Sequence, residues 1–205
     1  MLRFVFKVIG LSLLLFSTVH ANIVAPDVMI KSVTDEVIAA IRADKDIQSG
    51  HKKKLLELIE KKVFPHFNFN RMTQLAMGRN WRAASDEQKK QLVEEFRTLL
   101  VRTYTSAFTQ YKNEVIDYKP THIAEADSDA LVLSTVKKSS GQAIAVNYNM
   151  EKTDQGWKIY NLKIEGVSLV ENYRNTFNTE IQKSGIDGLI KVLTDKNKSL
   201  AENVK

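Results

Sequence analysis

The sequence predicts an α+β domain whose antiparallel meander sheet is covered on one face by several helices. Three observations support this fold class. The chain has only 8 Gly and 3 Pro in 205 residues, which favours long helices over a turn-rich β-sandwich. Apolar residues recur every three or four positions in the first half of the chain and again at its end. Between these parts, the period changes to two and short polar turns separate the apolar runs.

The first residues have the pattern of a secretory signal peptide. Arg3 and Lys7 form a positive start, and an apolar run from 8 to 19 ends at Val19-His20-Ala21. That run is about 12 residues long, whereas a bilayer-spanning helix needs roughly 20. We therefore expect cleavage after Ala21, which leaves 22–205 as a single domain in the periplasm. Cleavage lowers the formal net charge from +6 to +4.

Three helices are expected before the middle of the chain. An amphipathic helix follows Pro26, and Pro65 stops a second one. A short third helix runs from Asn68 to Met77, with Gly78 as its C-cap. The apolar positions of the first two helices are Ile30, Val33, Val37 and Ile41, then Leu55, Leu56, Ile59 and Val63.

The longest helix begins at a capping box. In this motif, the Ser85 side chain accepts from the backbone three residues on, and Gln88 reaches back to the backbone of Ser85. We expect this helix to end near Lys112. Its wide apolar face carries Leu92, Phe96, Leu99, Leu100, Tyr104, Phe108 and Tyr111.

Strands are expected at 131–136, 143–150 and 157–164, with a further one at 115–118. The short connections favour an antiparallel meander. Alternation gives the sheet one apolar face, which must be covered in the folded protein. That face is expected to carry Ile144, Val146, Tyr148 and Met150 from the middle strand, with Tyr160, Leu162 and Ile164 from the next.

Two helices close the chain. Ser168 and Glu171 form a second capping box, and Gly185 ends the helix that follows it. Asp187 then starts the last helix. We expect the tail from 196 to 205 to fray, as chain ends commonly do.

Motifs for chemistry are sparse. The absence of Cys excludes thiol catalysis, iron–sulfur clusters and disulfides. No two His residues have metal-ligand spacing, and neither the serine-hydrolase nor the nucleotide-binding glycine motifs occur. The positive charge is spread along the chain, which is weak support for nucleic-acid binding. We therefore expect neither an enzyme nor a metal or cofactor site.

Five segments in order resemble the MlaC family of periplasmic phospholipid-binding proteins, also called toluene-tolerance auxiliary proteins. The first segment is Leu75-Ala76-Met77-Gly78-Arg79-Asn80-Trp81-Arg82. The others are Gln88, Phe96-Arg97 with Tyr104, Glu165-Gly166-Val167-Ser168, and Gly185-Ile186-Asp187-Gly188-Leu189. The resemblance covers nearly the whole chain after the signal peptide.

This resemblance implies a glycerophospholipid carrier of the Mla pathway in a Gram-negative bacterium. Such a carrier shuttles lipid between an outer-membrane lipoprotein–porin complex and an inner-membrane ABC transporter with an MCE-domain subunit, and so maintains outer-membrane lipid asymmetry. The family fold places a sheet like that of nuclear transport factor 2 against helices, with the acyl chains in an apolar cavity between them. Phospholipid is then cargo, no cofactor and no nucleic acid bind, and the protein is expected to be a monomer.

The resemblance also assigns residues to the cavity. Ile144, Val146, Tyr148, Leu162 and Ile164 are expected to line the acyl chains from the sheet. Tyr104 and Phe108 cover them from the long helix, and Val167 lies at the cavity corner. Two alternatives stay open: an exported binding protein for small aromatic solutes, and a ligand-free adaptor in which these residues form a dry core.

Overall fold

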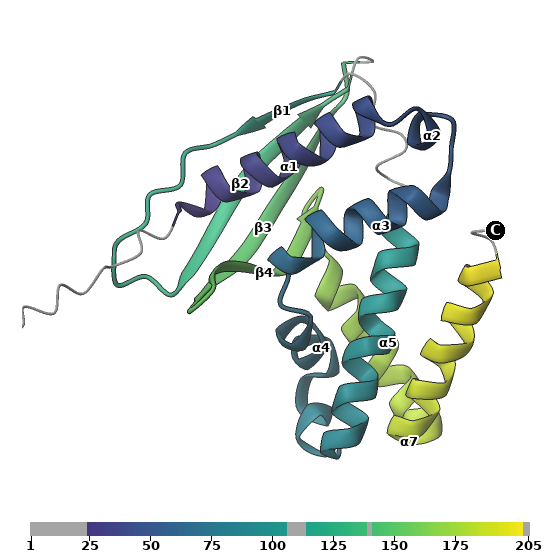
Figure 1. Ribbon diagram of the computed structural model, residues 1–205. Helices are drawn as coiled ribbons and strands as arrows, with labels where there is room; N and C mark the ends of the chain where they lie inside the picture. The colour runs from purple at the N-terminus through teal and green to yellow at the C-terminus, as the bar shows by residue number, and fades with distance from the viewer. Residues whose placement is uncertain (1–23, 106–113, 139–140, 203–205) are drawn as a thin grey trace, which may run out of the picture.

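The computed structural model describes residues 24–105, 114–138 and 141–202 (Figure 1). Helices occupy the first part of the chain. The α-helices there are α1 (Pro26–Ala43), α2 (Lys45–Gln48), α3 (Lys52–Lys62), α4 (Phe69–Met77) and α5 (Asp86–Tyr104), with short 3-10 helices η1 (Phe64–His66) and η2 (Gly78–Arg82). None of the helices in the described ranges is both long enough and apolar enough to cross a membrane.

The sheet is an antiparallel meander of five strands, which confirms the expected α+β class. The strands lie in the order of the chain, and each pairs antiparallel with the next. They are β1 (Val115–Tyr118), β2 (Asp129–Lys137), β3 (Ala143–Thr153), β4 (Gly156–Ile164) and β5 (Val167–Ser168). The fifth strand was not expected from the sequence, because two residues are too few to show a period.

One strand face differs from the expectation because of a β-bulge. Tyr148 pairs with Leu162, but Met150 pairs with Ile159, so Tyr160 is the extra residue of β4. The expectation that Tyr160 lies with Leu162 on the apolar face is therefore wrong. Its hydroxyl instead hydrogen-bonds to Asp129 Oδ1 at 3.3 Å, on the opposite face of the sheet. A period of two cannot reveal an inserted residue, since the bulge resets the alternation.

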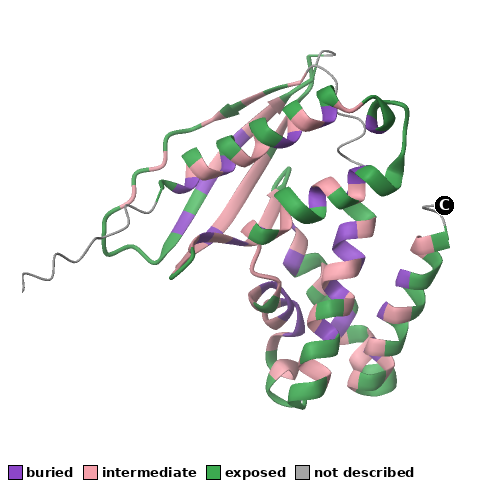
Figure 2. Cartoon of the chain, viewed as in Figure 1, coloured by how far each residue is buried: buried purple, intermediate pink, exposed green. Residues whose placement is uncertain are grey.

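The helices form two groups around the sheet (Figure 1). Helix α1 lies across one sheet face, whereas α3, α4, α5 and α7 (Leu169–Glu202) gather beyond β4. The apolar core between α1 and the sheet is closed by Ile30 of the helix. Figure 2 shows buried positions on the sides of α1 and α5 that face the rest of the protein. The sheet members of this first core are Ala130, Val132, Met150, Trp157 and Ile159.

A second core fills the group of helices. The rings of Phe96 in α5 and Phe177 in α7 (Leu169–Glu202) meet edge to face with centroids 5.0 Å apart. Tyr173 packs edge to face on Phe96 at 4.9 Å. Both phenylalanines are essentially inaccessible to solvent, so this contact is the centre of the helical layer.

The capping box at the start of α5 is confirmed. The Gln88 backbone N–H donates to Ser85 Oγ at 3.2 Å, and the Ser85 N–H donates to Gln88 Oε1 at 2.9 Å. The described helix ends at Tyr104. The expected end near Lys112, with Phe108 and Tyr111, lies outside the described residues.

Helix α7 extends into the part of the chain that was expected to fray. Its path breaks at Gly185, whose φ of 72° and ψ of −175° are not helical, as the sequence predicted. The second half then continues to Glu202. Asn197 is buried there, and its Nδ2 donates to the backbone oxygen of Glu95 at 2.9 Å and to Glu95 Oε2 at 2.6 Å. These bonds to α5 hold a segment that chain position alone predicts to be loose.

Candidate functional site

The five sheet residues assigned to the cavity share one face, as predicted. Val146 lies opposite Ile164, and Tyr148 lies opposite Leu162. Ile144 extends the same face toward the start of β3. Four of these side chains are partly buried, and Ile164 keeps 41% of its surface exposed. The face is thus apolar and open at the end of β4.

Among the paired residues of the five strands, this face carries one charged side chain, Lys152, which pairs with Trp157 near the end of β3 that lies away from Val146. The Ser134 hydroxyl on this face donates to the backbone oxygen of Val146 at 2.8 Å. Burial raises the pKa of Tyr148, and a hydrogen bond with Ser134 opposes that rise, so the phenol stays neutral at physiological pH. The face comprises Ile116, Tyr118, Ala130, Val132, Ser134, Val136, Ile144, Val146, Tyr148, Met150, Lys152, Trp157, Ile159, Leu162, Ile164 and Val167.

A tight hairpin brings Val167 to this face. Glu165 and Gly166 both have positive φ, 51° and 79°, and form the two-residue connection between β4 and β5. The Glu165 carboxylate accepts a hydrogen bond from the Ala145 N–H, which ties the turn to β3. Val167 therefore pairs with Ile164 and exposes 65% of its surface. The apolar face continues to the sheet edge.

Tyr104 lies at the end of α5 and is 36% exposed. Its hydroxyl lies beside that of Tyr173 in α7. Burial, followed by the nearby Tyr104, raises the pKa of Tyr173 above its usual range. The described contact of the Tyr104 hydroxyl thus lies within the helical layer. Phe108, the other helix residue expected at the cavity, lies outside the described residues.

Helix α1 supplies a cover for the apolar face that the site assignment missed. Ile30 packs in the core with Val132 and Met150, and Met29 packs against the same cluster. The helical spacing of Ile30, Val33, Val37 and Ile41 indicated a buried helix face. It could not identify which surface that face covers, because periodicity carries no information on partners.

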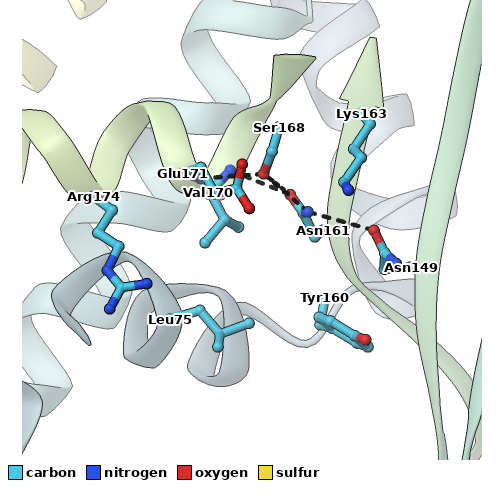
Figure 3. A pocket seen from close by; sticks show the side chains of 9 residues that line it. All are labelled: Leu75, Asn149, Tyr160, Asn161, Lys163, Ser168, Val170, Glu171 and Arg174. Carbon is cyan, nitrogen blue, oxygen red and sulfur yellow. Dashed lines mark hydrogen bonds between the residues drawn. The ribbon is translucent and has the colours of Figure 1, made fainter. Parts of the chain in front are cut away.

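Two pockets lie elsewhere on the described surface. The first, of about 240 Å³, is on the opposite sheet face, against α4 and α7 (Figure 3). Its lining residues are Leu75, Asn149, Tyr160, Asn161, Lys163, Ser168, Val170, Glu171 and Arg174.

The second pocket, of about 350 Å³, lies between α1 and the end of α3. Its lining includes Met29 and His66. None of the eight residues assigned to the acyl chains lines either of these two pockets. Within the described ranges, no group of three or more His, Asp or Glu side chains is arranged to hold a metal ion.

Comparison with known proteins decides the family. The model of the MlaC protein family matches residues 31–195, from α1 to the second half of α7. The chain belongs to the MlaC family. The match includes every strand of the sheet, both sides of the Glu165–Gly166 turn and the break at Gly185.

Two curated MlaC-family relatives are similar over most of their length. Toluene tolerance protein Ttg2D of Pseudomonas putida is 24% identical over 165 residues, which cover 79% of this chain and 75% of the relative. The intermembrane phospholipid transport system binding protein MlaC of Haemophilus influenzae is 22% identical over 169 residues, which cover 81% of this chain and 79% of the relative.

A solved structure matches the MlaC-family fold of this chain closely. It is the phospholipid-binding protein of Ralstonia solanacearum in complex with a phospholipid. The two chains are 39% identical, with a TM-score of 0.78. The match covers 85% of this chain and 98% of the other.

Proposed function

We propose that this protein is a periplasmic glycerophospholipid carrier that shuttles lipid between the outer and inner membranes. One observation carries the proposal: the apolar sheet face that ends at the exposed side chains of Ile164 and Val167. It is supported by family membership and by the 39% identity to a protein solved with a phospholipid. A surface of this kind is matched chemically to acyl chains and not to polar metabolites.

The energetics of acyl chains favour such a carrier. Burying one methylene is worth about 0.8 kcal/mol, so a chain of about 16 carbons gains roughly 12 kcal/mol. A free diacyl lipid therefore leaves a membrane very slowly. Since the bilayer and the carrier both keep the chains out of water, transfer between them is nearly balanced. Contact with partner complexes then sets whether lipid is loaded or released.

In this proposal, the sheet face contacts the acyl chains through the six residues assigned to it. Ile164 and Val167 lie at the open end of the face, while Val146 and Leu162 lie deeper. Tyr104 and Phe108 cover the chains from the helical side. The sheet residues are Ile144, Val146, Tyr148, Leu162, Ile164 and Val167.

The proposal extends to the partners of the carrier. Residues 1–21 direct export, and the mature chain exchanges lipid with an outer-membrane lipoprotein–porin complex and an inner-membrane ABC transporter with an MCE-domain subunit. The carrier acts as a monomer and uses neither nucleotide nor metal. It thereby contributes to outer-membrane lipid asymmetry.

Native mass spectrometry of the mature protein from the periplasm tests the proposal. We expect a mass excess that organic extraction resolves into diacyl or tetra-acyl phospholipid. The variant Val167→Glu is expected to lose this lipid and remain folded, because the substituted side chain is largely exposed. The matched control is Val192→Glu on α7, where the valine is 47% exposed.

Two results would contradict the carrier proposal, and a third would contradict only its residue assignment. A bare polypeptide mass that persists after incubation with labelled vesicles would support a ligand-free adaptor. Extraction of small aromatic molecules in place of lipid would support a solute-binding protein. Full lipid content in folded Val167→Glu would overturn the assignment of Val167 while leaving the carrier intact.

A further inference from the structure

The pocket on the other side of the sheet has the features of an anion site. It lies where β4 and the start of α7 meet α4, on the face opposite to the apolar one. Its volume of about 240 Å³ exceeds that of several waters, each of about 30 Å³ in the liquid. Of its charged lining residues, Lys163 and Arg174 are positive and Glu171 is negative. The pocket thus has an excess of positive charge.

Neither cation is paired with a carboxylate of the described residues. In the part of the chain that the structure describes, no ion pair or hydrogen bond joins Lys163 or Arg174 to a carboxylate. Figure 3 shows them on opposite sides of the pocket, with Glu171 between them. Surface lysines and arginines are commonly hydrated, but two unpaired cations that flank one hollow can bind a shared anion.

The Arg174 side chain lies against the glycine that follows α4. A methyl group at Gly78 would come within 3.0 Å of the Arg174 Nε, so the guanidinium lies directly against the backbone of this glycine. Gly78 has a φ of 54°, and it ends α4. The glycine therefore closes the helix and also leaves room for the guanidinium. A Cβ at this position would force the guanidinium to shift by a few tenths of an ångström.

Hydrogen bonds also hold several of the side chains that line the pocket. Asn161 is buried and donates to Ser168 Oγ at 3.0 Å, while its own Oδ1 accepts from the Val170 N–H at 3.2 Å. The β-bulge brings Tyr160 to the same side as Asn161. These bonds hold β4 against the start of α7 and leave Asn149 Nδ2 as a further donor on the pocket wall. Polar donors thus reach the hollow from both strands.

We propose that this pocket binds a phosphate group, with Lys163 and Arg174 pairing with its oxygens from opposite sides. A tetrahedral phosphate presents oxygens in several directions, whereas both oxygens of a carboxylate lie in one plane. The first arrangement matches cations that approach from β4 and from α7. The group belongs either to a lipid headgroup or to a soluble phosphate compound. The site itself stands independently of the proposed carrier function.

Titration of the delipidated, ¹⁵N-labelled mature protein with inorganic phosphate tests this site. We expect saturable shifts of the Lys163, Ser168 and Val170 backbone amides. Lys163→Gln and Arg174→Gln should each weaken binding about tenfold, because each removes a charge-assisted hydrogen bond. Glu171→Gln should strengthen it, because the negative neighbour is lost.

The control variant is Lys183→Gln, an exposed residue of α7 outside the pocket. It removes the same charge and should leave phosphate binding unchanged. Absence of saturable shifts would overturn the site. Equal weakening by Lys183→Gln would also overturn it, because the response would then follow net charge alone.

Repeating the titration on lipid-loaded protein separates the two sources of phosphate. A response that disappears on loading identifies a headgroup in the pocket, and an unchanged response identifies a soluble compound. The lipid content of Val167→Glu is measured separately by extraction. If the carrier proposal fails, the phosphate titration can still be interpreted. If the phosphate site is wrong, the lipid content of Val167→Glu can still be interpreted.

Discussion

Ile164 and Val167 pair with each other across the Glu165–Gly166 turn, and both expose large parts of their apolar side chains. Exposed β-branched residues at a sheet edge weaken solubility and favour unwanted strand pairing. Their neighbours Val146 and Leu162 on the same face are partly buried. The pair therefore forms the open end of a continuous apolar surface, as a binding surface for acyl chains requires.

The first prediction concerns this open end. Ile164→Asp is expected to remove bound phospholipid, because a carboxylate beside the acyl chains would lose its hydration. The fold should persist, since the side chain already contacts solvent. Lipid content per protein, measured by extraction and phosphorus analysis, checks the outcome.

Leu131→Asp provides the matched control for this variant. Leu131 is 48% exposed, lies in the same sheet and faces the opposite side. We expect it to retain lipid at the wild-type ratio. Equal loss in both variants would indicate general destabilisation of the sheet and not a local effect on the lipid surface.

The second prediction concerns the helical core. Phe96→Ala should lower the free energy of unfolding by about 3–5 kcal/mol, since it leaves a cavity beside Phe177 and Tyr173. Urea denaturation followed by circular dichroism measures the change. Val192→Ala, at an exposed position, should change stability by no more than about 0.5 kcal/mol. A cost for Phe96→Ala as small as that of the control would exclude this pair as the centre of the core.

The third prediction concerns the end of α7. Because Asn197 donates two hydrogen bonds to Glu95, the amides around it should exchange slowly with solvent. Asn197→Ala should speed this exchange and cost about 1–3 kcal/mol of stability. Hydrogen exchange by mass spectrometry checks both, with the exposed Asn175→Ala as control. Rapid exchange of the wild-type segment would support the expectation of a frayed tail.

The fourth prediction concerns pH. Burial, and then the positive charge of Lys158, lower the pKa of His66 below its usual value of 6.5. The unfolded chain therefore binds this proton more tightly than the folded one. The stabilising contribution of neutral His66 is present above pH 6.5 and declines as the pH falls through the lower, folded-state pKa.

NMR titration of the His66 ring checks this effect directly. The midpoint is expected below pH 6.5, and Lys158→Gln should move it upward. His66→Gln should reduce the loss of thermal stability between pH 7 and more acidic conditions. A midpoint above 6.5 would mean that the nearby Glu36, which raises the pKa, outweighs burial and Lys158.

Much of the architecture could be read from local patterns. The capping box at Ser85 and the break at Gly185 depend on neighbours within a few residues, so the sequence by itself determined them. The pairing of Tyr148 with Leu162 on one face also follows from alternation and short turns. The family resemblance, carried by segments such as 75–82 and 165–168, was equally visible in the chain.

The tertiary structure alone decided what depends on contacts between distant segments. The bulge moved Tyr160 to the polar face, and Glu95 of α5 anchored the expected loose end at Asn197. The pocket lined by Lys163 and Arg174 has no sequence signal either, because its two cations come from a strand and from a helix that are distant from α4 in the chain. Periodicity specifies which face of an element is apolar, but only packing specifies what that face, or a charge beside it, will meet.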